Sequence, residues 1–133
     1  MEVTRDVGPH KTEIRGMDDG NYPNRRLENN HFFFLITENG RALGYIWIEI
    51  RDYQENAFLR AYQSLFVHHI SIAIDHQNKG LGKQFMNKVM EFALERNIKR
   101  IELDYWSDNE NAKSFYEKMG FTPYREFVFK ELD

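Results

Sequence analysis

The stretch from Phe66 to Gly82 constrains the fold of this chain more than any other part of it. Its first half is a near-continuous run of apolar and β-branched residues, the composition of a buried strand in the centre of a sheet. Its second half, the sequence QNKGLG at residues 77–82, is a short polar loop with two glycines two residues apart. An amphipathic helix is predicted directly behind the loop, from about Lys83 to Arg96. A strand, a glycine loop and a helix N-terminus are a known way to bind phosphate groups, although the same order also occurs as an ordinary strand-to-helix turn.

The composition of the 133 residues is that of one globular domain, which we expect to span residues 1–133. Hydrophobic residues make up 41% of the chain and aromatic residues 15%, which is enough to form a core. The net charge of −3 argues against a protein that binds nucleic acid. The absence of cysteine excludes disulfides, cysteine–zinc sites and thiol nucleophiles, and it fits a cytoplasmic location. We expect no membrane span, because no apolar run reaches roughly 20 residues, and no signal peptide, because the N-terminus is polar from Thr4 on.

Two strands joined by a tight turn are predicted in the N-terminal half. Residues 31–37 and 41–51 are rich in aromatic and β-branched residues, and Asn39-Gly40 between them is a strong hairpin signal. We expect these two strands to pair antiparallel. Residues 1–30 contain several Gly, Pro and Asn, so we expect them to be irregular, with one short helix near Tyr22–Glu28. A loop of this length is either a functional flap or poorly ordered.

The C-terminal half is predicted to alternate strands and helices. The predicted elements are a strand at about 64–74, a helix at 84–96, a strand at 99–106, a helix at 110–119 and a last strand at 125–131. A strand, a helix and a strand in this order imply a right-handed parallel crossover. The predicted fold class is therefore α/β, with a mixed central sheet, an antiparallel N-terminal hairpin, a parallel crossover and flanking helices.

Two motifs in a fixed order connect this chain to a known family. The loop QNKGLG has the pattern Q-x-x-G-x-G, and residues 109–121, NENAKSFYEKMGF, have the pattern N-x-x-A-x-x-x-Y-x-x-x-G-F. From about Leu65 to Phe121 the chain resembles the GCN5-related N-acetyltransferase (GNAT) superfamily. The resemblance implies that acetyl-CoA is the cosubstrate, without a metal, and that the acetyl group moves directly to a primary amine of a small molecule or a protein. The family usually has helices before the hairpin, so the N-terminal helical part is expected to be shortened, and the wall of the acceptor site is either missing or completed by another subunit.

The resemblance also implies where acetyl-CoA binds. The physics of the loop agrees, because Gly80 and Gly82 let backbone N–H groups approach a pyrophosphate and the helix dipole is positive there. Lys79 and Lys83 either add positive charge or are solvated surface cations. Asn109 is implied to contact the cofactor, and it is an equally good helix cap. The implied cofactor-binding residues are Ile70, Ser71 and Ile72 on the strand, Gln77, Asn78, Lys79, Gly80, Leu81, Gly82 and Lys83 in the loop, and Asn109 and Tyr116.

Acetyl transfer to an amine needs a base for the amine and an acid for the departing thiolate. Tyr116 matches the general acid of the family, with a packing role on an amphipathic helix as the alternative. His68 matches the base of arylalkylamine acetyltransferases, with a hydrogen-bonded structural histidine as the alternative, and its neighbour His69 is expected on the opposite face of the strand. Asp104 matches the base of some ribosomal-protein acetyltransferases. Glu49 is a weaker candidate because it is expected to face solvent, and a base that acts through water is also open.

Other functions and partners are also considered. An acyl-CoA-binding or regulatory module without turnover would keep the same fold and loop. A different nucleotide-binding protein is disfavoured, because the loop lacks the Gly-Lys-Ser/Thr of a P-loop. Besides the amine acceptor we consider a homodimer, with no nucleic acid and no membrane as partners. The chain is rich in aromatic residues, and the dimer interface would use those of them that are exposed beside the cleft. The candidates are Phe32, Phe33, Phe34, Tyr45, Trp47, Tyr105 and Trp106.

Overall fold

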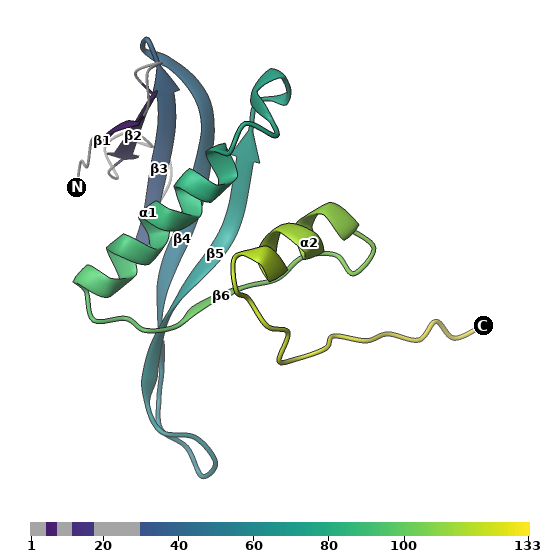
Figure 1. Cartoon of the computed structure of the whole chain (residues 1–133). Helices are drawn as coiled ribbons and strands as arrows, with labels where there is room; N and C mark the ends of the chain where they lie inside the picture. The colour runs from purple at the N-terminus through teal and green to yellow at the C-terminus, as the bar shows by residue number, and fades with distance from the viewer. Residues whose placement is uncertain (1–4, 8–11, 18–29) are drawn as a thin grey trace.

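The computed structural model describes residues 5–7, 12–17 and 30–133, with side chains from residue 30 onward. The described residues form a six-stranded sheet in the order β1-β2-β3-β4-β5-β6, and helix α1 lies across one face of it (Figure 1). The strands are β1 Arg5–Val7, β2 Thr12–Met17, β3 His31–Glu38, β4 Arg41–Tyr53, β5 Tyr62–Ile72 and β6 Ile101–Leu103. The helices are α1 Leu81–Glu95 and α2 Glu110–Lys118, and a 3-10 turn at Ile74–His76 follows β5. Neighbouring strands are antiparallel except β5 and β6, which are parallel.

The hydrophobic core lies between α1 and the sheet. Alternate residues of the central strands point to α1, as the period of two in a strand requires. The buried side chains are Phe34, Ile36, Ile46, Ile48, Leu65 and Val67 from the strands and Phe85, Met86, Val89, Phe92 and Ala93 from α1. The opposite residues of the same strands form what we call the open face of the sheet. Neither described helix is long and apolar enough to span a bilayer.

The predicted hairpin between β3 and β4 is confirmed. Asn39 and Gly40 both have positive φ, 51° and 80°, which a two-residue turn of this hand requires. The predicted strand, helix and parallel strand are also present as β5, α1 and β6. The predicted mixed α/β sheet is therefore confirmed.

The N-terminal segment differs from the prediction. The sequence predicts an irregular segment at residues 1–30, but β1 and β2 lie within it and β2 pairs along β3 from Thr12–Glu38 to Met17–Phe33. The hydrogen-bonding edge of β3 supplies the pairing, so β2 forms without an apolar pattern of its own. The helix predicted near Tyr22–Glu28 lies outside the described residues.

The C-terminal segment also differs from the prediction. The strand predicted at 125–131 is absent, because this segment pairs with no described strand and runs away from the sheet (Figure 1). The strand predicted at 99–106 is only three residues long, Ile101–Leu103. One contact ties the start of the tail to the sheet, where the Tyr124 hydroxyl donates to Glu102 Oε2 at 2.6 Å.

A β-bulge in β5 changes which side chains share a face. Trp47 pairs with His69 and Ile48 pairs with Val67, so His68 is an extra residue in the ladder. His68 contacts Glu49, and His69 Nδ1 lies 2.6 Å from the Tyr45 hydroxyl. Tyr45 and Glu49 are four residues apart in β4 and lie on its same face. His68 and His69 therefore both point to the open face, and the prediction that His69 points the other way is wrong.

Strand β5 is paired along its whole length on one side only. On the β4 side its ladder reaches Ile72, whereas on the β6 side it covers only Leu65 to Val67. Beyond Val67 the second edge of β5 faces no strand of the described chain. The Ile72 carbonyl accepts a hydrogen bond from the Gln77 side chain, and the other backbone groups of this edge suit a ligand that can pair with a strand.

Candidate active site

The loop between β5 and α1 presents a helix N-terminus to solvent. Gly80 is the N-cap with φ 81°, a conformation that favours glycine, and no side chain among the described residues caps the helix. The first hydrogen bond of the helix runs from the Gln84 N–H to the Gly80 carbonyl at 3.1 Å. The N–H groups of the first turn before Gln84 thus have no intrahelical acceptor. Such a turn favours a bound anion.

The second glycine of the loop has a packing role in addition to the one expected. A Cβ atom at Gly82 would lie 3.3 Å from Cζ of Phe115. The glycine therefore gives room for the ring that packs α2 against the start of α1. Its small size serves helix packing as well as access to the backbone.

The loop is also tied to the free edge of β5. The Gln77 side chain donates from Nε2 to the carbonyl of Ile72 at 3.1 Å. This bond holds the loop against the strand end, so the unpaired edge at Ile70–Ile72 leads directly to the N-terminus of α1. Lys79 and Lys83 are exposed beside it.

Asn109 and Tyr116 both belong to α2. The Oδ1 atom of Asn109 accepts a hydrogen bond from the Ala112 N–H at 3.0 Å, so Asn109 caps this helix. Tyr116 is buried, and its ring stacks on Tyr105 with centroids 5.8 Å apart. Burial raises the pKa of Tyr116 above its usual value, so its phenol is protonated at neutral pH. A protonated phenol is the state that a proton donor needs.

Asp104 and His68 occupy different environments. Asp104 is exposed and directly follows β6. His68 is partly buried on the open face, and its ring lies between Trp47, stacked at 4.4 Å, and the edge of Phe66 at 5.0 Å. The described contacts do not join His68 to Tyr116 or to Asp104.

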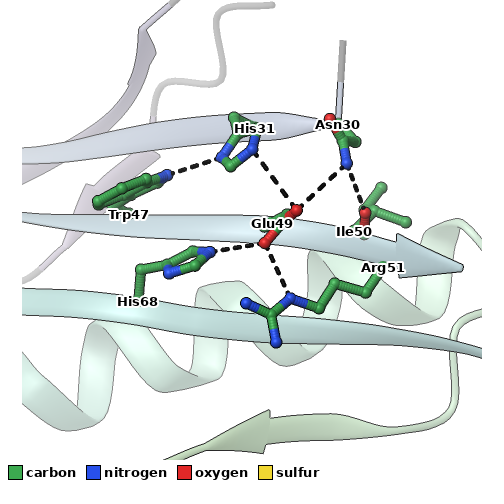
Figure 2. Close-up of polar contacts among 7 residues, drawn as sticks. All are labelled: Asn30, His31, Trp47, Glu49, Ile50, Arg51 and His68. Carbon is green, nitrogen blue, oxygen red and sulfur yellow. Dashed lines mark hydrogen bonds and ion pairs between the residues drawn. The ribbon is translucent and has the colours of Figure 1, made fainter. Parts of the chain in front are cut away.

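The structure brings His68 together with Glu49, which the sequence pattern predicts to face solvent. The Glu49 side chain is only 18% exposed, so that expectation is wrong. His68 Nε2 lies 2.7 Å from Glu49 Oε1, and Arg51 Nε donates to the same oxygen at 2.9 Å. His31 Nε2 lies 3.5 Å from Glu49 Oε2, to which Asn30 Nδ2 donates at 3.4 Å (Figure 2). Three adjacent strands thus direct polar side chains at one carboxylate.

The charge of Glu49 follows from these contacts. Burial acts to raise the pKa of Glu49, but the hydrogen bonds from Arg51 and His68 outweigh it and the pKa is lowered. The carboxylate is therefore ionised at neutral pH and accepts from the groups around it.

The spacing of His31, Glu49 and His68 also suits a metal ion, because their ligand atoms lie within 4.8 Å of one another. The hydrogen bond of Trp47 does not fit such an ion. The indole Nε1–H can only donate, and it donates to His31 Nδ1 at 3.0 Å, so the proton of the neutral imidazole is on Nε2. A metal would need the lone pair of that Nε2. The cluster therefore fits a hydrogen-bonded network around a carboxylate better than a metal site.

Comparison with known proteins identifies the family. Residues 3–121 match the family model of the acetyltransferase (GNAT) family, which is most of the chain. The chain belongs to the GNAT family. The resemblance that rests on the two motifs is thereby confirmed, and both motifs lie inside the matched residues.

Relatives in the GNAT family are similar over about three quarters of this chain. An uncharacterized N-acetyltransferase of Lactobacillus delbrueckii subsp. lactis is 32% identical over 98 residues, which cover 74% of this chain and 56% of that protein. N-alpha-acetyltransferase 30 of Schizosaccharomyces pombe is 27% identical over 94 residues, covering 71% and 59%. The chain thus spans less than two thirds of the length of these relatives.

Solved structures share the GNAT fold at low sequence identity. A mutant of the BH1408 protein from Bacillus halodurans superposes with a TM-score of 0.77 at 14% identity, covering 87% of this chain and 75% of that chain. The aminoglycoside acetyltransferase AAC(6')-Iy, in complex with a CoA bisubstrate analogue, superposes with a TM-score of 0.73 at 14% identity, covering 92% and 98%. At these identities the likeness concerns the fold.

His31 and Trp47 were not among the predicted candidates for the site, and Glu49 was predicted only as a weaker candidate that faces solvent. One signal was available, because Trp47, Glu49 and Arg51 alternate along a predicted strand and so share a face. The bulge that brings His68 against Glu49 left no mark in the sequence.

Proposed function

We propose that this chain transfers an acetyl group from acetyl-CoA to a primary amine of a small molecule or a protein. The observation that carries the proposal is the continuity of two anchoring features. The unpaired edge of β5 at Ile70–Ile72 leads through the Gln77 hydrogen bond to the uncapped N-terminus of α1. A pantetheine arm can pair with such an edge, and the pyrophosphate can bind the N–H groups of the helix.

The proposed chemistry assigns one role to each catalytic residue. His68 takes a proton from the acceptor ammonium, and the free amine attacks the thioester carbonyl. The C–N bond forms, the C–S bond breaks, and Tyr116 gives its proton to the departing thiolate. The second proton that the amine nitrogen loses as it becomes an amide returns to the Tyr116 phenolate through solvent, and His68 releases the first proton to solvent, so that both residues are regenerated. Asp104 is the other candidate base, and its exposed position at the end of β6 makes it the weaker one.

The acceptor is proposed only as an amine. A fission-yeast relative is named an N-alpha-acetyltransferase, and a structural neighbour is an aminoglycoside acetyltransferase. A panel of peptide N-termini, lysine peptides, polyamines and aminoglycosides therefore covers the chemistry to be tested. The acidic net charge of −3 favours cationic acceptors from this panel.

The test measures the binding of acetyl-CoA and the release of CoA thiol. Because the chain has no cysteine, a thiol reagent detects CoA alone. We expect Gly80→Glu to abolish binding, because a carboxylate is placed where the pyrophosphate binds. Gly40→Glu is the matched control, since Gly40 also has positive φ and a Cβ atom there would meet no described atom within 4 Å, yet Gly40 lies in the β3–β4 turn. If Gly80→Glu binds acetyl-CoA as tightly as Gly40→Glu does, the loop is not part of the binding site.

A binding module without turnover is the alternative function. It predicts that acetyl-CoA raises the melting temperature while no amine of the panel yields thiol. Turnover with any amine excludes it.

We also propose a homodimer and a cytoplasmic location. Of the aromatic residues considered for an interface, only Trp106 is highly exposed, at 84%. The tail adds exposed side chains, among them Phe127 and Phe129. Apolar side chains gathered on one segment support an interface.

The proposed cytoplasmic location is supported by the absence of cysteine from the chain.

A further inference from the structure

The Glu49 network points to a role beyond the residues already assigned. We propose that Glu49 is a positioning residue that holds the His68 imidazole with its Nε2–H toward the carboxylate and leaves Nδ1 free to take the proton from the acceptor amine. This inference rests on the proposed function, because it names the group that prepares the proposed base.

The first step is the direction of the hydrogen bond between the two residues. Glu49 is an ionised acceptor, so the 2.7 Å contact between His68 Nε2 and Glu49 Oε1 has the imidazole as donor. A neutral imidazole carries one N–H, so its other nitrogen, Nδ1, holds the lone pair. Glu49 therefore selects one tautomer of His68.

The second step is that the carboxylate cannot easily turn away. Arg51 donates to Oε1, and Asn30 and His31 face Oε2 (Figure 2). The Trp47 indole fixes His31 as a donor at Nε2, because its N–H occupies the Nδ1 lone pair. Oε1 is thus contacted by a donor from β4, and Oε2 by donors from β3 and from the residue before it. The contact of Oε1 with His68 Nε2, at 2.7 Å, is the shortest of the set.

The third step is the packing around the imidazole. Trp47 stacks on His68 at 4.4 Å with an interplanar angle of 23°, and Phe66 meets it edge-on at 5.0 Å. These two neighbours fix the plane of the His68 imidazole, and the hydrogen bond to Glu49 fixes which ring nitrogen points to the carboxylate. A base held in one orientation loses little entropy on reaching the transition state.

The network also serves the protonated intermediate. When His68 accepts the amine proton at Nδ1, the imidazolium keeps its Nε2–H on the ionised carboxylate, and no further proton moves. The charge-assisted hydrogen bond becomes stronger at that moment. The other charged or titratable groups around Glu49 and His68 are Arg51 on β4, His31 on β3 and His69 on β5. Glu102 on β6 lies opposite Phe66 in the ladder, and its side chain contacts Arg100 and Tyr124.

The first experiment compares Glu49→Gln with Asp52→Asn. Glutamine keeps an oxygen for the hydrogen bonds but loses the charge, so we expect kcat to fall by about tenfold or more while KM for acetyl-CoA is unchanged. Asp52 is an exposed carboxylate three residues from Glu49 whose described contact is Gln63, and its neutralisation should change neither quantity. A folded Glu49→Gln enzyme with wild-type kcat would overturn the proposal.

The second measurement needs no variant. Nitrogen-15 NMR of the wild-type histidines distinguishes the two neutral tautomers, and we expect His68 to carry its proton on Nε2. A proton on Nδ1 would overturn the positioning role. If the wild type acetylates no amine, the proposed function fails, and the tautomer alone then decides whether Glu49 positions His68.

Discussion

At the residue scale, burial determines the state of Tyr116. The side chain is 7% exposed and packs against the rings of Tyr105, Phe115 and Phe121. Burial raises its pKa above the usual value of 10.0, which favours the protonated phenol at neutral pH. Burial of Tyr116 therefore suits both a packing role and the proposed proton donation, and the two roles do not exclude each other.

Tyr116→Phe separates these roles, because it removes the hydroxyl and keeps the ring. We expect kcat to fall by roughly tenfold to a thousandfold, with the melting temperature nearly unchanged. In the wild type the midpoint of the activity loss caused by ionisation of Tyr116 should lie above pH 10.0, because burial raises the pKa of this phenol. The measurement is steady-state kinetics over a pH series, followed by thiol release.

Tyr105→Phe is the matched control for this prediction. It removes a hydroxyl from the ring stacked on Tyr116 and leaves the proposed acid in place. Similar losses in both variants would mean that the hydroxyls act through packing. An unchanged kcat in Tyr116→Phe would mean that Tyr116 has only a packing role in the core.

At the element scale, local patterns predicted most of the fold. The β3–β4 hairpin follows from Asn39-Gly40, and α1 follows from its apolar periodicity. Both signals lie within a few consecutive residues, so no distant contact is needed to interpret them. The two motifs predicted the loop and α2 for the same reason.

The predictions that are wrong concern features that depend on contacts between distant segments of the chain. Strand β2 exists because the edge of β3 pairs with it, and the strand predicted at 125–131 is absent because no described edge pairs with it. The bulge at His68 depends on how β4 and β5 are aligned, and that alignment brings the His68 side chain against Glu49, which is partly buried. Strand pairing between distant segments is not encoded in the local pattern of either one.

Asn109 allows a test of one element. Its side chain caps α2, and the family resemblance also implies a cofactor contact. We expect Asn109→Ala to lower the stability of the protein by about 1 kcal/mol, because the Ala112 N–H loses its acceptor. Asn109→Asp keeps the cap and should retain that stability.

Binding then separates the cap from a cofactor contact. Stability is measured by urea unfolding and acetyl-CoA affinity by calorimetry on both variants. If Asn109 contacts acetyl-CoA, Asn109→Asp should bind it more weakly, because the amide donor is replaced by a negative charge. Wild-type affinity in Asn109→Asp would leave Asn109 as a cap only.

At the scale of the whole molecule, the two faces of the sheet have separate tasks. The face under α1 holds the apolar core, whereas the open face carries Trp47, Glu49 and His68. The unpaired edge of β5, where we propose that acetyl-CoA binds, runs along the boundary between them. The proposed base His68 on the open face and the N-terminus of α1 on the other side of the sheet are thus both reached from this one strand.

The tail beyond Tyr124 leads to the last prediction. Large apolar side chains are exposed along it, with Phe127 fully exposed and Phe129 at 86%. In a dimer that buries them, replacing both by serine should shift the protein to a monomer, measured by sedimentation at several concentrations. Leu94→Ser is the control, because it removes an exposed apolar side chain from α1. A monomeric wild type would contradict the interface, while the tail variant should keep its melting temperature as a monomer, because side chains in water contribute little burial energy to the fold.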